Sequence, residues 1–165
     1  MISRRAVTII FAFIFLICVV EKALSVDAVD LLLQVIKQPE GEVLLQFPVE
    51  RGDLFHVSYT HSSDHTPVYD TFKIDEKGTI VLIEEDYEWY GAGLEFHPDA
   101  DAKISFTGGR VRVLLNRIFP HLPLRVGRVA GHVFKYKDKE IPLLSIAEGG
   151  DRLWIVTVKE GASHE

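Results

Sequence analysis

Cysteine is almost absent from this chain, since Cys18 is the only one among 165 residues. It lies within an apolar run near the start, and the preceding Ile17 is not the small residue that a lipoprotein site requires. The remainder of the sequence therefore offers neither a disulfide nor a thiolate nucleophile. We also expect no lipid anchor on Cys18.

Basic residues are outnumbered, with 18 Lys and Arg against 24 Asp and Glu, for a formal net charge of −6. Three of the basic residues and one acidic residue lie in the first 25 positions, so the rest of the chain carries −8. An acidic domain repels phosphate backbones, and no basic stripe interleaved with aromatic residues occurs. Nucleic acid is therefore not an expected partner.

Long apolar runs are also scarce, and the one present is Ala6–Val20, in which only Thr8 is polar. It follows Arg4 and Arg5, as the apolar region of an export signal follows its basic region. Fifteen helical residues span about 22 Å, less than the roughly 30 Å hydrocarbon core of a bilayer. The sequence thus favours a cleaved leader over an uncleaved membrane anchor, which remains the alternative.

Small residues near the end of this run suit a signal peptidase, since Ala23 and Ser25 would occupy positions −3 and −1. Under either alternative the arginines stay on the cytoplasmic side of the membrane. We therefore divide the chain into a signal peptide or anchor at 1–25 and one exported domain at 26–165. We expect that domain in the periplasm or another extracytoplasmic space. If it is tethered to the cytoplasmic membrane, residues 6–20 are the tether.

The mature chain has the composition of one compact globular domain, with 47% hydrophobic and 25% charged residues. Short runs of β-branched and aromatic residues are broken at short intervals by Gly, Pro or Asp, which predicts an all-β sandwich or barrel-like domain. About 8–10 short antiparallel strands are expected. The predicted strands are Glu42–Val49, Leu54–His61, Val68–Ile74, Thr79–Glu85, Lys103–Phe106, Arg110–Leu115, His132–Tyr136, Glu140–Leu144 and Arg152–Lys159.

Three segments carry more particular expectations. The run Val26–Ile36 fits either a short helix or a first strand, and its periodicity does not decide between them. Asn116–Phe119 is predicted to form a short helical turn that ends at Pro120. The last strand, Arg152–Lys159, is apolar on both faces and is therefore expected in the middle of its sheet.

Metal-ligating residue types are densest in one predicted strand end and loop, which holds His61, Asp64 and His65. A loop could bring these three side chains onto one ion. The alternative is an ordinary hydrogen-bonded turn, for which the same residue types are typical.

The same loop holds Ser62 and Ser63, which a histidine base and Asp64 or Asp70 could activate for hydrolysis. No Gly-x-Ser-x-Gly elbow marks either serine as a nucleophile. A metal-binding protein or hydrolase using His61, Asp64, His65 and Asp70 is therefore the alternative function.

Trp89 and Tyr90 precede Gly91-Ala92-Gly93, where a bare backbone would let a ligand or partner approach two contact aromatics. The segment could instead be a bend whose aromatics cover the core. The acidic run Glu84-Glu85-Asp86 lacks the ligand order of a calcium loop and is predicted to form a solvated face.

A family resemblance follows from the order of Tyr59, His61-Ser62, Pro67-Val68-Tyr69-Asp70 and Gly91-Ala92-Gly93. In this order, and in its leader and length, the chain resembles the DUF1850 proteins, a bacterial family of unknown function. Its members are small exported or tethered proteins often encoded beside TAXI-type TRAP transporters. The resemblance implies an accessory role in solute uptake, with a permease or solute receptor as partner.

These residues suggest a polar patch at one end of the domain, made of Tyr59, His61, Ser62, Asp70 and Gly91-Ala92-Gly93. The other interpretation is a structural latch, in which His61 donates to Asp70 and the glycines permit close packing. We expect a non-catalytic module that binds a solute or partner and needs no cofactor.

Overall fold

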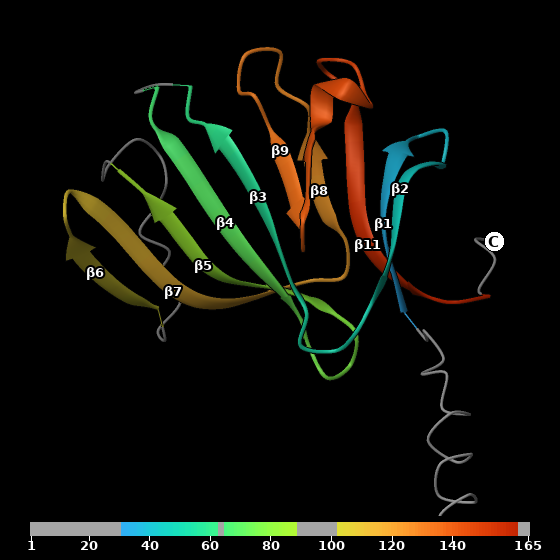
Figure 1. Ribbon diagram of the computed structural model, residues 1–165, viewed down its shortest axis with the longest axis horizontal. Coiled ribbons are helices and arrows are strands. Elements are labelled where there is room, and N and C mark those ends of the chain that lie inside the picture. Colours follow the sequence, from blue (N-terminus) through green and yellow to red (C-terminus); the bar gives the residue numbers. More distant parts are fainter. Residues whose placement is uncertain (1–30, 63–64, 89–101, 162–165) are drawn as a thin grey trace, which may run out of the picture.

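The computed structural model describes residues 31–62, 65–88 and 102–161. These residues form two antiparallel β-sheets that face each other and do not close into a barrel (Figure 1). The prediction of an all-β sandwich is confirmed. The described residues contain no helix that is both long and apolar enough to cross a membrane.

The larger sheet has seven strands in the order β10-β9-β3-β4-β5-β7-β6. Its strands are β3 (Leu54–Thr60), β4 (Pro67–Ile74), β5 (Ile80–Tyr87), β6 (Lys103–Thr107), β7 (Arg110–Phe119), β9 (Val133–Tyr136) and β10 (Lys139–Pro142). A 3-10 turn, η1 (Leu143–Ser145), follows β10.

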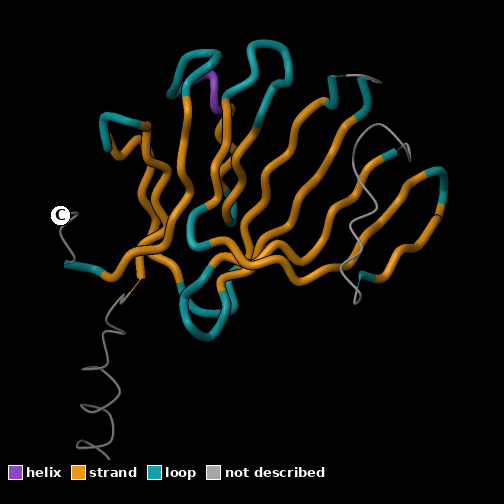
Figure 2. The backbone as a smooth tube through the Cα atoms, turned by 180° about the vertical axis from the view of Figure 1, so that it is seen from behind, coloured by secondary structure: helices purple, strands orange, loops and turns teal. Residues whose placement is uncertain are grey.

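The smaller sheet has four strands in the order β2-β1-β11-β8. Its strands are β1 (Leu31–Gln38), β2 (Glu42–Val49), β8 (Leu122–Arg125) and β11 (Arg152–Lys159). Figure 2 shows from behind that the β5–β6 half of the larger sheet extends beyond the smaller one.

All nine predicted strands are present, and the described part of Val26–Ile36 belongs to strand β1. The short helical turn predicted at Asn116–Phe119 is wrong, because β7 continues through these residues. Strand β8 was not predicted, since Pro123 lies within it. It is an edge strand, where proline is tolerated.

Strand β11 lies between β1 and β8, as its apolar faces predict. Its inner face buries Leu153 and Ile155 in the core, whereas Trp154 on the outer face is 38% exposed.

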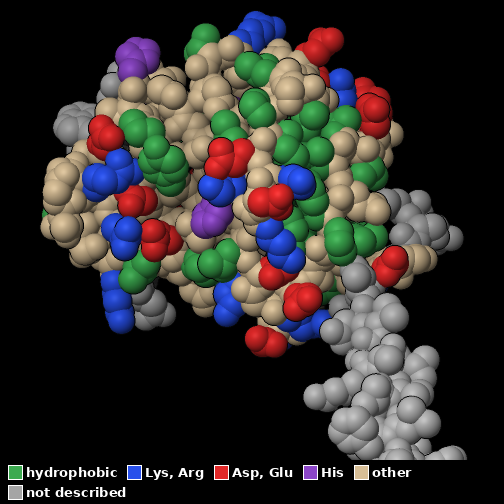
Figure 3. Space-filling view, in the orientation of Figure 1, with side chains coloured by type: hydrophobic (Ala, Val, Ile, Leu, Met, Phe, Trp, Pro, Cys, Tyr) green, Lys and Arg blue, Asp and Glu red, His purple; other side chains and the backbone are tan. Residues whose placement is uncertain are grey.

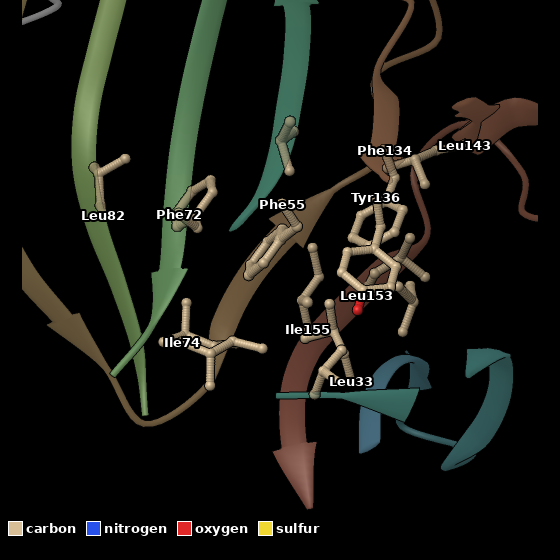
Figure 4. Close-up of a cluster of buried hydrophobic side chains, with 14 of the residues drawn as sticks. Leu33, Phe55, Phe72, Ile74, Leu82, Phe134, Tyr136, Leu143, Leu153 and Ile155 are labelled. Atoms are coloured by element: carbon tan, nitrogen blue, oxygen red, sulfur yellow. The ribbon is translucent and has the colours of Figure 1, made fainter. Parts of the chain in front are cut away.

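The main core fills the space between the two sheets with a chain of packed phenylalanine rings (Figure 4). Phe55 stacks on Phe72 at 4.9 Å between ring centroids and on Phe134 at 5.7 Å, and Phe134 in turn stacks on Phe47 at 5.9 Å. Phe47 belongs to the smaller sheet and the other three to the larger one. Each buried ring contributes about 1.5–3 kcal/mol, so these contacts hold the sheets together.

A second, smaller apolar cluster occupies the inner face of β4, β5 and β7, and consists of Val68, Tyr87, Val111 and Val113. Along β4, Val68 belongs to this cluster and Phe72 to the main core. Asp70 stands between them on the same strand. A titratable residue therefore interrupts the apolar inner face where the two clusters meet.

Candidate functional site

A β-bulge in β5 determines which acidic side chains face the interior. The register of β5 against both neighbouring strands shifts between Leu82 and Glu84. Leu82 before the bulge belongs to the main core and Tyr87 after it to the smaller cluster. Because side chains alternate along a strand, Glu85 faces inward with Tyr87. Glu84 faces outward, where it pairs with Arg112.

The inward-facing Glu85 is the direct cross-strand partner of Asp70. Asp70 shares its face with Val68 and Phe72, which are 0% and 2% exposed. Opposed residues of an antiparallel pair have Cβ atoms only about 4.5–5.5 Å apart. The sheet thus holds two carboxyl groups side by side on an apolar face.

The carboxyl group of Asp70 is in an unusual state for an aspartate. Its Oδ1 atom is buried and accepts no hydrogen bond from the described residues. Burial raises the pKa of Asp70 to about 7, the charge of Glu85 adds to the rise, and the guanidinium of Arg117 opposes it. Asp70 therefore keeps its proton to a much higher pH than an ordinary aspartate does.

Tyr59 supplies a phenol to the same face. It is paired with Val68 across β3 and β4, which makes it a diagonal neighbour of Asp70. Burial raises the pKa of Tyr59, and the negative charges of Asp70 and Glu85 raise it further. The hydroxyl stays protonated and can donate. Arg117 on β7 is the cross-strand partner of the inward-facing Leu82 and so lies on the same face. We call Tyr59, Asp70, Glu85 and Arg117 the inner-face cluster.

The loop between β8 and β9 is packed against the end of β3 next to this cluster. The Ala130 carbonyl accepts from the Thr60 N–H at 2.7 Å, and the His132 ring lies 5.3 Å from that of Tyr59. The His132 Nδ1 atom accepts from the Gly127 N–H at 3.2 Å, and burial lowers the pKa of His132. The neutral His132 ring therefore borders the cluster beside Tyr59.

The predicted metal residues lie in the hairpin loop after β3. The His61 N–H donates to the Thr66 carbonyl at 2.9 Å, and the His65 N–H donates to the His61 carbonyl at 3.0 Å. Ser62 is exposed, and Asp64 lies outside the described residues. In the described ranges no three His, Cys, Asp or Glu side chains could hold a metal. The predicted site at His61, Asp64 and His65 stays a prediction.

The structure brings together only part of the predicted polar patch or latch. Tyr59 and Asp70 share the inner face, but His61 pairs with Thr66, which precedes β4 and lies four residues before Asp70. Four strand residues span about 13 Å, and Oδ1 of Asp70 accepts from none of the described residues. Trp89, Tyr90 and Gly91-Ala92-Gly93 lie outside the described residues.

Sequence reasoning missed Glu85 and Arg117. The prediction that Glu84-Glu85-Asp86 forms a solvated face holds for the outer members, since Glu84 pairs with Arg112 and Asp86 with Arg110. Glu85 is half-buried like these two neighbours, but its side chain faces the inner side of the sheet, opposite Asp70. Figure 3 shows acidic and basic side chains interspersed on the side of the molecule formed by β4, β5 and β7.

Comparison with known proteins gives one match. The family described as domain of unknown function DUF1850 matches residues 55–143, more than half of the chain. No curated protein and no solved structure matches. The matched segment runs from β3 into η1 and includes the whole inner-face cluster. The chain belongs to the DUF1850 family.

Proposed function

We propose that the chain is an exported, non-catalytic module that binds a small solute or partner through the inner-face cluster and assists a TAXI-type TRAP transport system. The basic residues and apolar run before residue 26 support export to the periplasm, with cleavage or tethering of the leader. The role in transport is what the resemblance to the family implies.

The observation that carries the binding role is the Oδ1 atom of Asp70. A buried acceptor without a partner costs about 1–3 kcal/mol, and most such atoms in proteins are satisfied. Among the described residues, none donates to this acceptor, and burial together with the charge of Glu85 raises the pKa of Asp70. Because the atom is buried, a ligand reaches it only when the side chains over it move aside, and a hydrogen bond donated there then recovers the lost energy.

The charges of the cluster indicate what kind of ligand group fits. Asp70 and Glu85 provide two carboxyl groups, Arg117 one positive charge and Tyr59 a neutral phenol. With both acids ionised the cluster carries a net charge of −1, which favours an N–H donor or an ammonium group. Such a group would lower the pKa of Asp70, so binding would release a proton near neutral pH.

The test is an in-cell crosslink of the tagged full-length chain in its native host, followed by mass spectrometry of the co-purifying proteins and of the mature N-terminus. Three versions are compared: the unaltered chain, Asp70→Asn in the cluster, and Asp86→Asn on the outer face as matched control. We expect the unaltered and Asp86→Asn chains to recover a permease or solute receptor, and Asp70→Asn to recover much less.

Two results would contradict the proposal. One is recovery of no transport protein by the unaltered chain. The other is equal recovery by all three versions, which would remove the inner-face cluster from the interaction. An N-terminus at or near Val26 would support export with cleavage, whereas retention of the first residues in the membrane fraction would support the tethered form.

A further inference from the structure

The opposite face of the larger sheet carries a second feature that the inner-face cluster does not explain. A hollow of about 390 Å³ opens there over β9, β3 and β4. We call it the outer hollow, and its lining residues are His56, Ser58, Tyr69, Val133, Lys135 and Glu140. Its volume lies within the range of small-molecule sites, roughly 300–1,000 Å³.

The strand register explains why the surface is hollowed at this point. Ser58 is paired with Tyr69 on one side and with Val133 on the other. The small serine side chain therefore forms the floor between two larger neighbours. Next to it, His56 is paired with Thr71 and Lys135. Because the lining groups project from paired strands, the hollow exists before any ligand arrives.

Three polar groups in the hollow have hydrogen-bonding capacity to spare. The His56 Nδ1 atom lies 3.2 Å from the Thr71 Oγ1 atom, which leaves its Nε2 atom for another partner. Burial and the neighbouring Lys135 lower the pKa of His56, so the imidazole is neutral. The hydroxyls of Ser58 and Tyr69, which also line the hollow, can each donate and accept a hydrogen bond.

The fixed charges of the hollow cancel. Lys135 and Glu140 form an ion pair with each other at its rim. A charged ligand would find no uncompensated opposite charge, whereas a neutral ligand with several hydroxyls could donate to Glu140 and accept from Lys135. The neutral His56, Ser58 and Tyr69 groups likewise suit hydroxyl partners.

Tyr69 adds an ordered aromatic surface. Its side chain is 47% exposed, and the Arg110 guanidinium lies 5.2 Å from the ring centroid, which holds the ring by a cation–π contact. A ring of this kind can cover the apolar C–H face of a sugar while its hydroxyl reaches a polar group. The outer hollow therefore has a preformed shape, no net charge and an aromatic side chain at its edge.

We propose that the outer hollow binds a neutral polyhydroxylated molecule of about one sugar ring. Ser58 forms the floor, Tyr69 stacks on the ring, and His56 with the Lys135–Glu140 pair contacts the hydroxyls. This site is independent of the inner-face cluster, because it lies on the other face of the same strands. For a ligand of about twelve heavy atoms we expect a dissociation constant on the order of 1 mM.

The experiment uses the full-length chain, purified in a detergent whose head group is not a sugar. D-glucose and D-galactose are tested as neutral probes by saturation-transfer NMR, and succinate and glycine as charged ones. Ser58→Val fills the floor with a residue that suits a strand. Ser105→Val, an exposed β6 position outside the hollow, is the matched control. The far-UV circular dichroism spectrum reports whether each variant is folded.

We expect at least one of the two sugars to bind. Ser58→Val and Tyr69→Ala should raise its dissociation constant about tenfold or more, whereas Ser105→Val and Asp70→Asn should leave that constant unchanged. Tyr69→Phe, which keeps the ring, should weaken binding less than Tyr69→Ala. The proposal is overturned if neither sugar binds at about 50 mM, roughly fifty times the expected constant. It is equally overturned if the charged probes bind in their place, or if a folded Ser58→Val chain binds the sugar normally.

Discussion

Glu84 and Glu85 are neighbours in the sequence and lie on opposite faces of the same strand. On the outer face, Glu84 lies 3.3 Å from the Arg112 guanidinium, and Asp86 lies 2.6 Å from that of Arg110. On the inner face, Glu85 lies beside Asp70, whose Oδ1 atom accepts from none of the described residues.

The comparison shows that the surroundings of the carboxyl groups, rather than the number of charges, distinguish the candidate site. Each outer carboxylate has an arginine partner in contact with water, and such pairs contribute about 0–1 kcal/mol. The inner carboxyl groups share an apolar face, where charge is poorly solvated and the pKa of Asp70 rises to about 7. Acidic side chains thus form ion pairs with arginines on one face, whereas on the other face the pKa of an aspartate is raised.

The largest contrast is expected from removing one arginine on each face. Arg117→Met takes away the positive charge that favours ionised Asp70. We expect a loss of about 2–4 kcal/mol in the free energy of unfolding at pH 8, because two acids then remain side by side on an apolar face without this positive charge. Arg112→Met on the outer face should lose less than about 1 kcal/mol. Urea unfolding of the full-length chains measures both, and equal losses would refute the difference between the faces.

A smaller effect, of opposite sign, is expected from Asp70→Asn. The folded pKa of about 7 is above the unfolded value of about 3.9, so the unfolded chain ionises first as the pH rises. Asp70 therefore lowers stability progressively between about pH 4 and pH 7, after which its contribution is constant. Allowing for partial exposure, Asp70→Asn should be more stable than the natural chain by about 1–3 kcal/mol at pH 8 and equal at pH 4.

The matched variant Asp86→Asn breaks the pair with Arg110 on the outer face. It should lose up to about 1 kcal/mol at pH 8 and gain nothing. The measurement is the free energy of unfolding as a function of pH for the three chains. A gain from Asp70→Asn that persists unchanged at pH 4 would rule out ionisation as its cause.

Much of the fold could be predicted because its signals are local. Alternation and turn residues locate strands such as Glu42–Val49 and Arg152–Lys159 with their observed limits. The prediction failed at Asn116–Phe119, where two nearby prolines resemble the end of a helix. The chain instead continues as a strand, because Phe119 reaches the main core and packs against Phe72.

The candidate site could be predicted only in part, because half of it depends on register. Tyr59 and Asp70 stand in a segment rich in chemically active side chains, which sequence reasoning selects. Glu85 becomes their neighbour only through the bulge between Leu82 and Glu84, and Arg117 only through the extension of β7. Neither a bulge nor a strand extension has a reliable local signal in these residues.

The finest test separates the two neighbouring glutamates. Glu85→Gln removes the like charge beside Asp70 and should lower the pKa of Asp70, although not to its ordinary value, because burial is the larger cause of the rise. Glu84→Gln, one residue away on the outer face, should leave that pKa unchanged. Carbon-13 NMR titration of the aspartate carboxyl groups in the full-length chain measures both. If Glu84→Gln moved the pKa of Asp70 as far as Glu85→Gln, the bulge would not separate the two faces electrostatically. Asp70 would then be responding to the summed charge of the acidic run rather than to its cross-strand neighbour.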